Sequence, residues 1–150
     1  MAASTKTQAP DEVQLRELIE NWAKALRAKD VEGVVSHFAP DMLLFDLAPP
    51  LQYRGADAYR KSLQEWFPTF QGPVGYEIRE LSITAGDGVA FSHSLNRIRG
   101  KRTSGEETDV WVRGTVCYRK LDGKWVVTHE HVSAPFYMDG SLRAAVDLEP

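Results

Sequence analysis

The ionisable side chains best placed for acid–base chemistry are Asp46 and two histidines near the end of the chain. Asp46 closes an apolar run that begins at Met42. In an apolar cavity, desolvation raises the pKa of a carboxyl group, which makes its carboxylate a usable proton acceptor near neutral pH. The alternative is that Asp46 begins the turn leading to Pro49 and stays solvated. The sequence leaves both interpretations open.

The two histidines, His129 and His131, fall on the same face of a predicted strand, because side chains alternate along extended backbone. An imidazole that faces a pocket can relay protons or stabilise an oxyanion, whereas a structural histidine simply satisfies a hydrogen bond. A β-bulge would exchange the two faces, so the alternation does not decide whether the histidines or Glu130 between them face a ligand. The pair with Asp46 lacks a further ligand at a recognisable spacing, and we expect no metal.

One face of the predicted strand over residues 108–120 carries Trp111, Arg113 and Thr115. An arginine in a partly apolar pocket needs an anion to offset its burial. Arg113 therefore pairs with a carboxylate of the protein, such as Asp46, or binds a carboxylate, phosphate or enolate of a ligand. We treat it as the candidate ligand anchor.

The first half of the sequence predicts three helices that position these residues. An apolar stripe with helical spacing follows Asp11, which suits a helix start. A second, short helix is expected over residues 30–40 and a third over 55–68, each ended by a proline. The apolar run over residues 42–47 has the length of a strand. The stripe of the first helix comprises Leu15, Leu18, Ile19, Trp22, Ala23 and Leu26.

The second half of the sequence predicts four strands, joined by turns rich in glycine and aspartate. His93 and Asn96 fall on opposite faces of the second of these strands, so at most one of them lines a cavity. Three helices followed by an antiparallel meander predict an α+β fold, in which a cone-shaped, curved antiparallel sheet wraps around three N-terminal helices and encloses a pocket. The expected strands span residues 76–84, 88–100, 108–120 and 124–133.

Length and composition are those of one globular domain. The chain has 150 residues, of which 43% are hydrophobic and 26% charged. Residues 1–10 are small and polar, so we expect a disordered tail followed by a single domain over 11–150.

The lone Cys117 agrees with a reducing compartment, and we expect a cytoplasmic protein. The chain ends in a short apolar and acidic tail that either caps the mouth of the cone or packs on a partner subunit.

Several classes of partner are disfavoured by the same composition. A net charge of −3 argues against nucleic acid as a partner. No apolar run approaches the roughly 20 residues of a membrane span. The sequence has no phosphate-binding loop, dinucleotide glycine motif or nucleophile elbow, so we expect no nucleotide cofactor and no serine hydrolysis.

Two groups of segments resemble one known superfamily. Residues 118–125 and 129–135 are similar to the closing hairpin of the SnoaL-like and kinase-association branches of the nuclear transport factor 2 superfamily. The series 29–35, 38–41, 44–46 and 53–55 is similar to the helix, strand and helix-start signature that the superfamily shares. The resemblance covers Asp11 to about Pro135. It implies the same α+β cone, on which isomerases, cyclases, dehydratases, binding domains and assembly domains are all built.

The resemblance also implies roles for particular residues. Asp46 matches the general-base aspartate of ketosteroid isomerase, whereas the oxyanion-hole tyrosine and protonated aspartic acid of that enzyme are replaced by Trp22 and Thr115. Neither replacement is a good acid, although each can donate a hydrogen bond, so steroid isomerisation itself is not implied. The alternative for Trp22 is plain packing on the helix face. The resemblance further implies that the face with Thr115 points into the cone.

These observations lead to one expected function and one alternative. We expect a small-molecule-binding SnoaL-like domain, possessing no metal or nucleotide cofactor, that acts as an acid–base isomerase, cyclase or dehydratase (an isomerase or lyase) on a small carbonyl compound. Asp46 and His131 are the expected catalytic residues. The expected ligand-binding residues are Trp22, Trp111, Arg113, Thr115 and His129. The alternative is a non-catalytic ligand-binding or oligomerisation module, and under both we expect a homodimer formed through the sheet.

Overall fold

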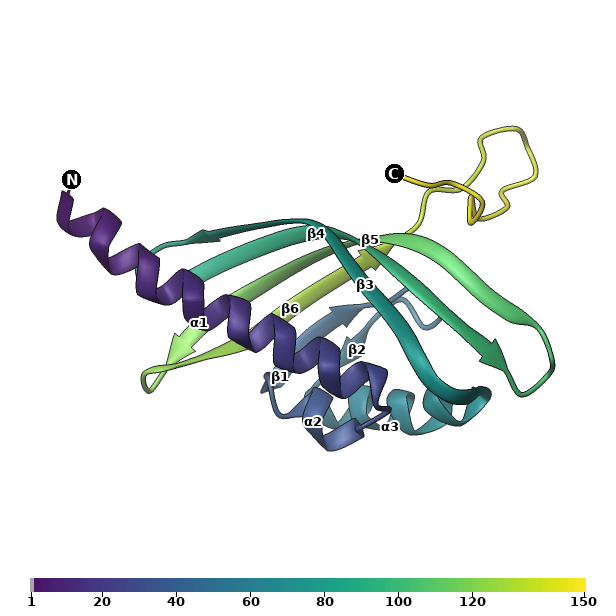
Figure 1. Ribbon diagram of the computed structural model, residues 1–150, viewed down its shortest axis with the longest axis horizontal. Coiled ribbons are helices and arrows are strands. Elements are labelled where there is room, and N and C mark those ends of the chain that lie inside the picture. Colours follow the sequence, from purple (N-terminus) through teal and green to yellow (C-terminus); the bar gives the residue numbers. More distant parts are fainter. Residues whose placement is uncertain (1) are drawn as a thin grey trace.

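The computed structural model describes residues 2–150, and the side chains from Pro10 onward. Its longest helix, α1 (Ala2–Arg27), lies across one face of a curved sheet (Figure 1). The helix includes Pro10 and begins upstream of Asp11, so the predicted helix start is wrong. The division into a tail over residues 1–10 and a domain over 11–150 stays a prediction, and Met1 lies outside the described residues.

The next elements follow the prediction with shifted boundaries. Helix α2 (Val31–Val35) is capped by Asp30, whose side chain accepts a hydrogen bond from the Gly33 backbone. The chain leaves this helix well before Pro40 and enters strand β1 (Phe38–Phe45), so the expected helix end at Pro40 is wrong. After the two-residue strand β2 (Tyr53–Arg54), helix α3 (Ala56–Trp66) passes into the 3₁₀ turn η1 (Phe67–Thr69).

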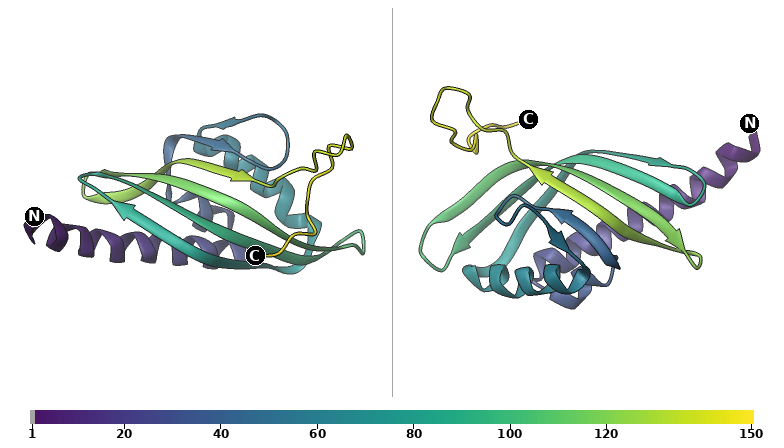
Figure 2. Two further views of the ribbon diagram at one scale, coloured as in Figure 1. Left: turned by 90° about the horizontal axis from the view of Figure 1, so that it is seen from above. Right: turned by 180° about the vertical axis from the view of Figure 1, so that it is seen from behind.

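The remaining strands form most of the sheet. They are β3 (Phe70–Ala85), β4 (Val89–Arg102), β5 (Glu107–Leu121) and β6 (Lys124–Ser133). Of these, β3, β4 and β5 are longer than expected and β6 has the expected bounds. The sheet order is β2-β1-β6-β5-β4-β3, with antiparallel neighbours except for the parallel pair β1 and β6. The sheet is therefore mixed rather than wholly antiparallel. With three helices on one face of a curved, unclosed sheet, the predicted α+β class is confirmed (Figure 2).

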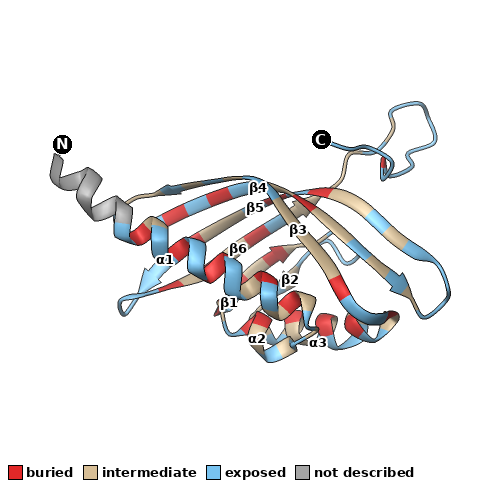
Figure 3. Ribbon diagram, viewed as in Figure 1, coloured by how far each residue is buried: buried red, intermediate tan, exposed pale blue. Residues whose placement is uncertain are grey.

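The core lies between α1 and the face of the sheet that α1 covers, here called the inner face (Figure 3). Leu15, Leu18 and Leu26 of the predicted stripe are buried there. Asp11, also buried, accepts hydrogen bonds from Lys120 Nζ at 3.0 Å and Trp125 Nε1 at 3.1 Å. Because these partners flank the β5–β6 turn, one carboxylate attaches α1 to that end of the sheet.

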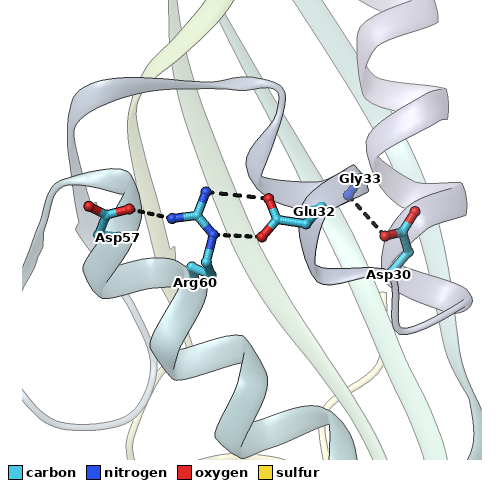
Figure 4. A network of polar contacts seen from close by, with 5 residues as sticks. All are labelled: Asp30, Glu32, Gly33, Asp57 and Arg60. Carbon is cyan, nitrogen blue, oxygen red and sulfur yellow. Dashed lines mark hydrogen bonds and ion pairs between the residues drawn. The ribbon is translucent and has the colours of Figure 1, made fainter.

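A second polar network joins the two short helices at the surface. The Arg60 guanidinium on α3 donates to Glu32 of α2 at 2.7 Å and also pairs with Asp57, one turn earlier on its own helix (Figure 4). Exposed ion pairs of this kind contribute little to stability, because solvent screens them. The network orients α2 and α3 on the outside and does not reach the core.

The C-terminal segment after β6 forms an irregular loop that projects beyond the sheet (Figure 1). It is closed by a bridge between Phe136 and Ala144, and Met138 near its tip is 84% exposed. The Asp109 ion pair raises the pKa of Arg97, with a smaller contribution from Glu149 of this segment. This contribution places Glu149 near Arg97, which lies on the face of β4 opposite α1. The end of the chain therefore lies over the outer face of the sheet.

Candidate functional site

A cavity of about 40 Å³ lies between α1 and the inner face of the sheet. This volume holds a few ordered water molecules. Strands β3 to β6 and β1 supply most of its wall, and α1 closes the opposite side. The polar lining consists of Trp22, Tyr76, Ser92, Ser94, Asn96, Tyr118 and Glu130, and the remaining lining residues are apolar side chains and Gly114.

The inner face of β5 is the one that carries Gly114, Val116 and Tyr118. Arg113 and Thr115 are exposed on the outer face. The expectation that the face with Thr115 points into the cone is therefore wrong. Trp111 and Arg113, which share that face, also lie outside the cavity. The physical reason is hydrophobic alternation, because the set Val110, Val112, Gly114, Val116 and Tyr118 is the more apolar of the two faces and packs against α1.

Strand β6 changes face at a β-bulge. Val127 pairs with Tyr118 and His129 pairs with Cys117, so Thr128 between them has no opposite residue. Trp125 and Val127 point inward before the bulge, and Glu130 points inward after it. The histidines, which would share a face with Val127 on a regular strand, are consequently turned away from the cavity. His131 is exposed.

The carboxyl group of Glu130 dominates the electrostatics of the cavity. The residue is 7% exposed, and no described side chain or backbone group forms a hydrogen bond or ion pair with it. Burial, assisted by the nearby negative charge of Asp46, raises the pKa of Glu130 from 4.5 to about 8. Glu130 is therefore mostly protonated at neutral pH and can donate a hydrogen bond or a proton.

Asp46 is half-buried at the end of β1, beside the strand that carries Glu130. Leu44 pairs with Glu130 and Phe45 with His131 in the parallel register, and Asp46 follows directly. Its Oδ1 accepts a 2.7 Å hydrogen bond from the Leu47 backbone. Burial raises the pKa of Asp46, which that backbone bond partly offsets. Asp46 thus combines the turn role with the desolvation expected of a base, although it lies next to the cavity rather than in its lining.

Three aromatic side chains surround this carboxyl pair. Tyr59 of α3 is buried and Tyr76 of β3 is partly buried. Burial, together with the charges of Glu130 and Asp46, raises the pKa of each hydroxyl well above its usual value. Both phenols therefore stay protonated and can serve only as neutral hydrogen-bonding groups. The Tyr76 ring also packs edge-on against Trp22, with the ring centroids 5.2 Å apart.

Trp22, which lines the cavity, carries an unused hydrogen-bond donor. Among the described residues, its Nε1 is the one side-chain nitrogen or oxygen atom that is fully shielded from solvent and has no hydrogen-bond partner. The Tyr59 hydroxyl lies close to it but outside hydrogen-bonding geometry. A buried donor left unpaired costs about 1–3 kcal/mol, so a ligand oxygen that accepts from it recovers this cost. Trp22 lines the cavity, and its ligand-binding role stays a prediction.

Strand β4 supplies a polar wall facing α1. Ser92 Oγ and the Tyr118 hydroxyl are hydrogen-bonded at 2.8 Å, and Ser94 Oγ donates to Asn96 Oδ1 at 2.9 Å. His93 is exposed on the other face. The expectation that at most one of His93 and Asn96 lines the cavity is confirmed.

The remaining predicted site residues make contacts on the outer face. His129 Nδ1 lies 2.7 Å from the Leu43 carbonyl oxygen, and the Phe45 ring packs edge-on against both His129 and His131. Arg113 Nε donates to Ser133 Oγ at 3.1 Å rather than pairing with Asp46. The guanidinium groups of Arg79 and Arg97 lie over the Trp111 ring, with their Cζ atoms 5.0 Å and 5.8 Å from its centroid. These contacts account for the side chains structurally and leave their proposed functional roles untested.

Two further properties concern the chain as described. No group of three or more histidine, cysteine, aspartate or glutamate side chains in the described residues is arranged to hold a metal ion. None of the helices over residues 2–150 combines the length and the apolar character needed to cross a bilayer.

Sequence reasoning missed Glu130, Asn96's partner Ser94, and Tyr118 as cavity residues. The more apolar face of β5 was a usable signal for Gly114 and Tyr118, because the apolar face of a half-buried strand packs on the core. Glu130 offered no such signal, since its direction depends on a bulge that the sequence does not mark.

Comparison with known proteins identifies relatives of the whole domain. The family model for the SnoaL-like domain matches residues 15–137. A solved structure of a nuclear transport factor 2-like protein of unknown function from Pseudomonas putida KT2440 is 36% identical, with 95% of this chain and 98% of that chain covered and a TM-score of 0.86. No curated protein matches the chain.

Two more distant structures share the fold. A proposed scytalone dehydratase from Novosphingobium aromaticivorans is 22% identical, with 94% of this chain and 95% of that chain covered and a TM-score of 0.76. A proposed calcium/calmodulin-dependent protein kinase II association domain from Xanthomonas campestris is 23% identical, with 81% and 85% covered and a TM-score of 0.70. At these identities the likeness shows the fold alone.

Proposed function

Because the chain belongs to the SnoaL-like domain family and encloses a cavity with a buried carboxyl group, we propose that it is an acid–base isomerase or lyase acting on a small, uncharged carbonyl compound. The observation that carries the proposal is the Glu130 carboxyl, buried in the cavity with no partner in the described chain. A buried carboxyl lowers stability unless something offsets it. Such a cost is typical of functional sites, where stability is exchanged for reactivity.

Glu130 takes the part of the acid. With a pKa of about 8, it is protonated in most molecules at pH 7 and its conjugate base is strong enough to recover the proton. Its proton passes to the carbonyl oxygen as that oxygen gains negative charge. The Trp22 N–H donates a hydrogen bond to the same oxygen and stabilises the developing charge.

Asp46 takes the part of the base. Its carboxylate removes a proton from the carbon next to the carbonyl group while Glu130 protonates the oxygen, which gives an enol. In an isomerisation, Asp46 returns its proton to a different carbon while the enol O–H returns its proton to Glu130. In a dehydration, the enol O–H likewise returns its proton to Glu130 as the carbonyl re-forms, and a hydroxyl group on the β-carbon leaves as water with the proton that Asp46 removed. Because Asp46 lies beside the cavity, it reaches only the portion of the ligand that extends past Glu130 toward β1.

A ligand larger than a few water molecules requires the cavity to widen. A hollow of about 470 Å³ lies between α1 and β3, and Ile19, Ile78 and Leu81 line both it and the cavity. Because the two share one wall, we propose that ligands enter between α1 and the edge strand β3. These three side chains are apolar, which suits the passage of an uncharged molecule.

Hydrogen exchange next to a carbonyl group tests this proposal. Purified protein is incubated in D₂O with a panel of cyclic and aryl ketones, and the loss of the α-hydrogen signal is followed by proton NMR. We expect catalysed exchange for at least one ketone and a loss of about a hundredfold or more in Glu130→Gln and in Asp46→Asn. Asp41→Asn, which neutralises an exposed carboxylate on the same strand as Leu44, serves as the control.

The outcomes separate the two roles and the alternative function. Full exchange activity in Glu130→Gln contradicts the proposed acid, and full activity in Asp46→Asn contradicts only the proposed base. Absence of exchange for every ketone, from a folded protein, favours the non-catalytic ligand-binding or assembly module.

A further inference from the structure

The end of the cavity remote from Glu130 contains a second polar group, made by Asn96, Ser94 and Gly114. Asn96 is 6% exposed, and its Oδ1 accepts the 2.9 Å hydrogen bond from Ser94 Oγ. No described group accepts a hydrogen bond from Asn96 Nδ2. With its oxygen occupied, the amide presents its nitrogen, which is a donor only, toward the cavity.

Gly114 on the neighbouring strand makes room for this amide. A Cβ atom at Gly114 would lie 2.8 Å from Asn96 Nδ2, closer than real Cβ contacts. The backbone of Gly114 is not in the left-handed region, so conformational freedom does not require a glycine there. The absence of a side chain is what the position of Asn96 requires. The arrangement thus has three parts: a donor, a residue that orients it, and a gap that accommodates it.

The sheet register separates this donor from Glu130. Glu130 pairs with Val116, which pairs with Ser92, whereas Asn96 lies four residues further along β4. At about 3.3 Å per residue, that offset is about 13 Å along the strand direction. The wall between the two groups consists of small or neutral side chains, and the cavity lining contains no lysine, arginine or histidine. Nothing in it offsets the charge of an anionic ligand.

We infer that Asn96 is a specificity-determining residue that donates a hydrogen bond from Nδ2 to a second oxygen of an elongated, uncharged ketone. The inference rests on the proposed function, because Glu130 and Trp22 bind the carbonyl oxygen at the other end. The ligand class is therefore a two-ring or similarly extended molecule with an oxygen function at each end and an apolar body. Ser94 acts on the ligand only through Asn96 and is a positioning residue.

The test uses a matched pair of probes, 2-acetylnaphthalene and 6-acetyl-2-naphthol, which differ only in the distal hydroxyl group. Dissociation constants are measured by isothermal titration calorimetry. We expect the wild-type protein to bind the naphthol about threefold to tenfold more tightly, the usual effect of one neutral hydrogen bond. The methyl ether of the naphthol should keep this advantage, because it retains the acceptor oxygen.

Two variants remove the donor in different ways. Asn96→Leu deletes the amide, and Gly114→Ala displaces it while keeping every cavity functional group. Each should reduce the affinity ratio of the two probes to about one and leave the affinity for 2-acetylnaphthalene within about twofold. Thr115→Ala, beside Gly114 on the exposed face, is the control that should keep the wild-type ratio.

The outcomes distinguish this inference from the proposed function. An unchanged ratio in both variants, or a wild-type ratio of one, overturns the role of Asn96 even if Glu130→Gln abolishes α-hydrogen exchange. An affinity ratio reduced to about one in both variants supports the role of Asn96, even if Glu130→Gln leaves exchange intact and the catalytic proposal fails. Failure of the wild-type protein to bind either probe overturns the inference, whereas α-hydrogen exchange with the ketone panel still decides the proposed function.

Discussion

Val127 and Glu130, three positions apart on β6, face the same cavity because the bulge at Thr128 inserts one unpaired residue between them. On a regular strand, residues three apart point to opposite faces. The bulge therefore turns a carboxyl group into the core and turns His129 and His131 out of it. The chemistry available in the cavity is that of a protonated carboxyl group rather than that of an imidazole.

Burial of Glu130 makes stability depend on pH in a specific direction. Its pKa is about 8 in the folded chain and 4.5 when solvated, so the folded state holds one more proton than the unfolded state between these values. The stabilisation that this extra bound proton gives the folded state is fully present below pH 4.5. It is lost as pH rises to 8, by about 1.4 kcal/mol of unfolding free energy per pH unit. We expect Glu130→Gln to remove that decline, so that its melting temperature exceeds the wild-type value most at pH 8. Parallel pH profiles of the two proteins would show that Glu130 is not desolvated.

We expect the unpaired Trp22 N–H to contribute to turnover beyond the packing of its ring. Trp22→Phe keeps an aromatic ring against Tyr76 and removes only the donor and part of the ring system. We expect turnover of any exchanged ketone to fall about tenfold or more, because a donor to the developing oxyanion is lost. Trp66→Phe, the same substitution in a tryptophan that packs on Phe67 and Phe70, is the control. Equal losses in both variants would assign Trp22 to packing.

Asp11 predicts a separate loss of stability at acid pH. Its hydrogen bond from Lys120, together with the one from Trp125 and the Lys120 charge, lowers the pKa of Asp11 despite burial. The stabilisation that the ionised Asp11 carboxylate gives the folded state is present above pH 3.8 and is lost as pH falls through the lowered pKa. Asp11→Ala should lower the free energy of unfolding at pH 7 by about 1–3 kcal/mol, measured by urea titration. The difference from wild type should shrink below pH 3.8, and Glu12→Ala should have little effect at either pH.

The outer face of the sheet predicts association between copies of the chain. Val89 and Phe91 on β4 are 54% and 47% exposed, and the expected dimer through the sheet would cover them. If so, Phe91→Arg should convert a dimer to a monomer in light scattering while leaving the fold intact by circular dichroism. A wild-type monomer, or a dimer unaffected by Phe91→Arg, would reject association through this face.

The sequence predicted the architecture well because hydrophobic periodicity carries most of that information. The stripe of α1 and the turn residues of the meander both reflect burial and local backbone preferences. The parallel pairing of β1 with β6 was not predicted, since pairing between distant strands leaves no local pattern. The boundary near Pro40 was misplaced because the chain enters β1 before the proline, which sits within the strand.

The candidate site was predicted less well, and each error has one of two causes. Trp111, Arg113 and Thr115 were assigned inward from a resemblance, against the more apolar alternation of β5. The histidines of β6 were assigned to the site without knowledge of the bulge at Thr128. A shift of one residue moves every later side chain to the opposite face, so small errors in register become complete errors in site composition. The inward face of Trp22 follows from the helical spacing of the α1 stripe, whereas its role in ligand binding stays a prediction.

The most direct test of the account is the titration of the Glu130 carboxyl carbon by NMR, in protein labelled with ¹³C at glutamate and assigned by comparison with Glu130→Gln. We predict a midpoint near pH 8 for this one signal, and a lower midpoint in Asp46→Asn because a neighbouring negative charge is removed. A midpoint near the ordinary 4.5 in the wild-type protein would contradict the central claim, since an ionised Glu130 has no proton to give at neutral pH.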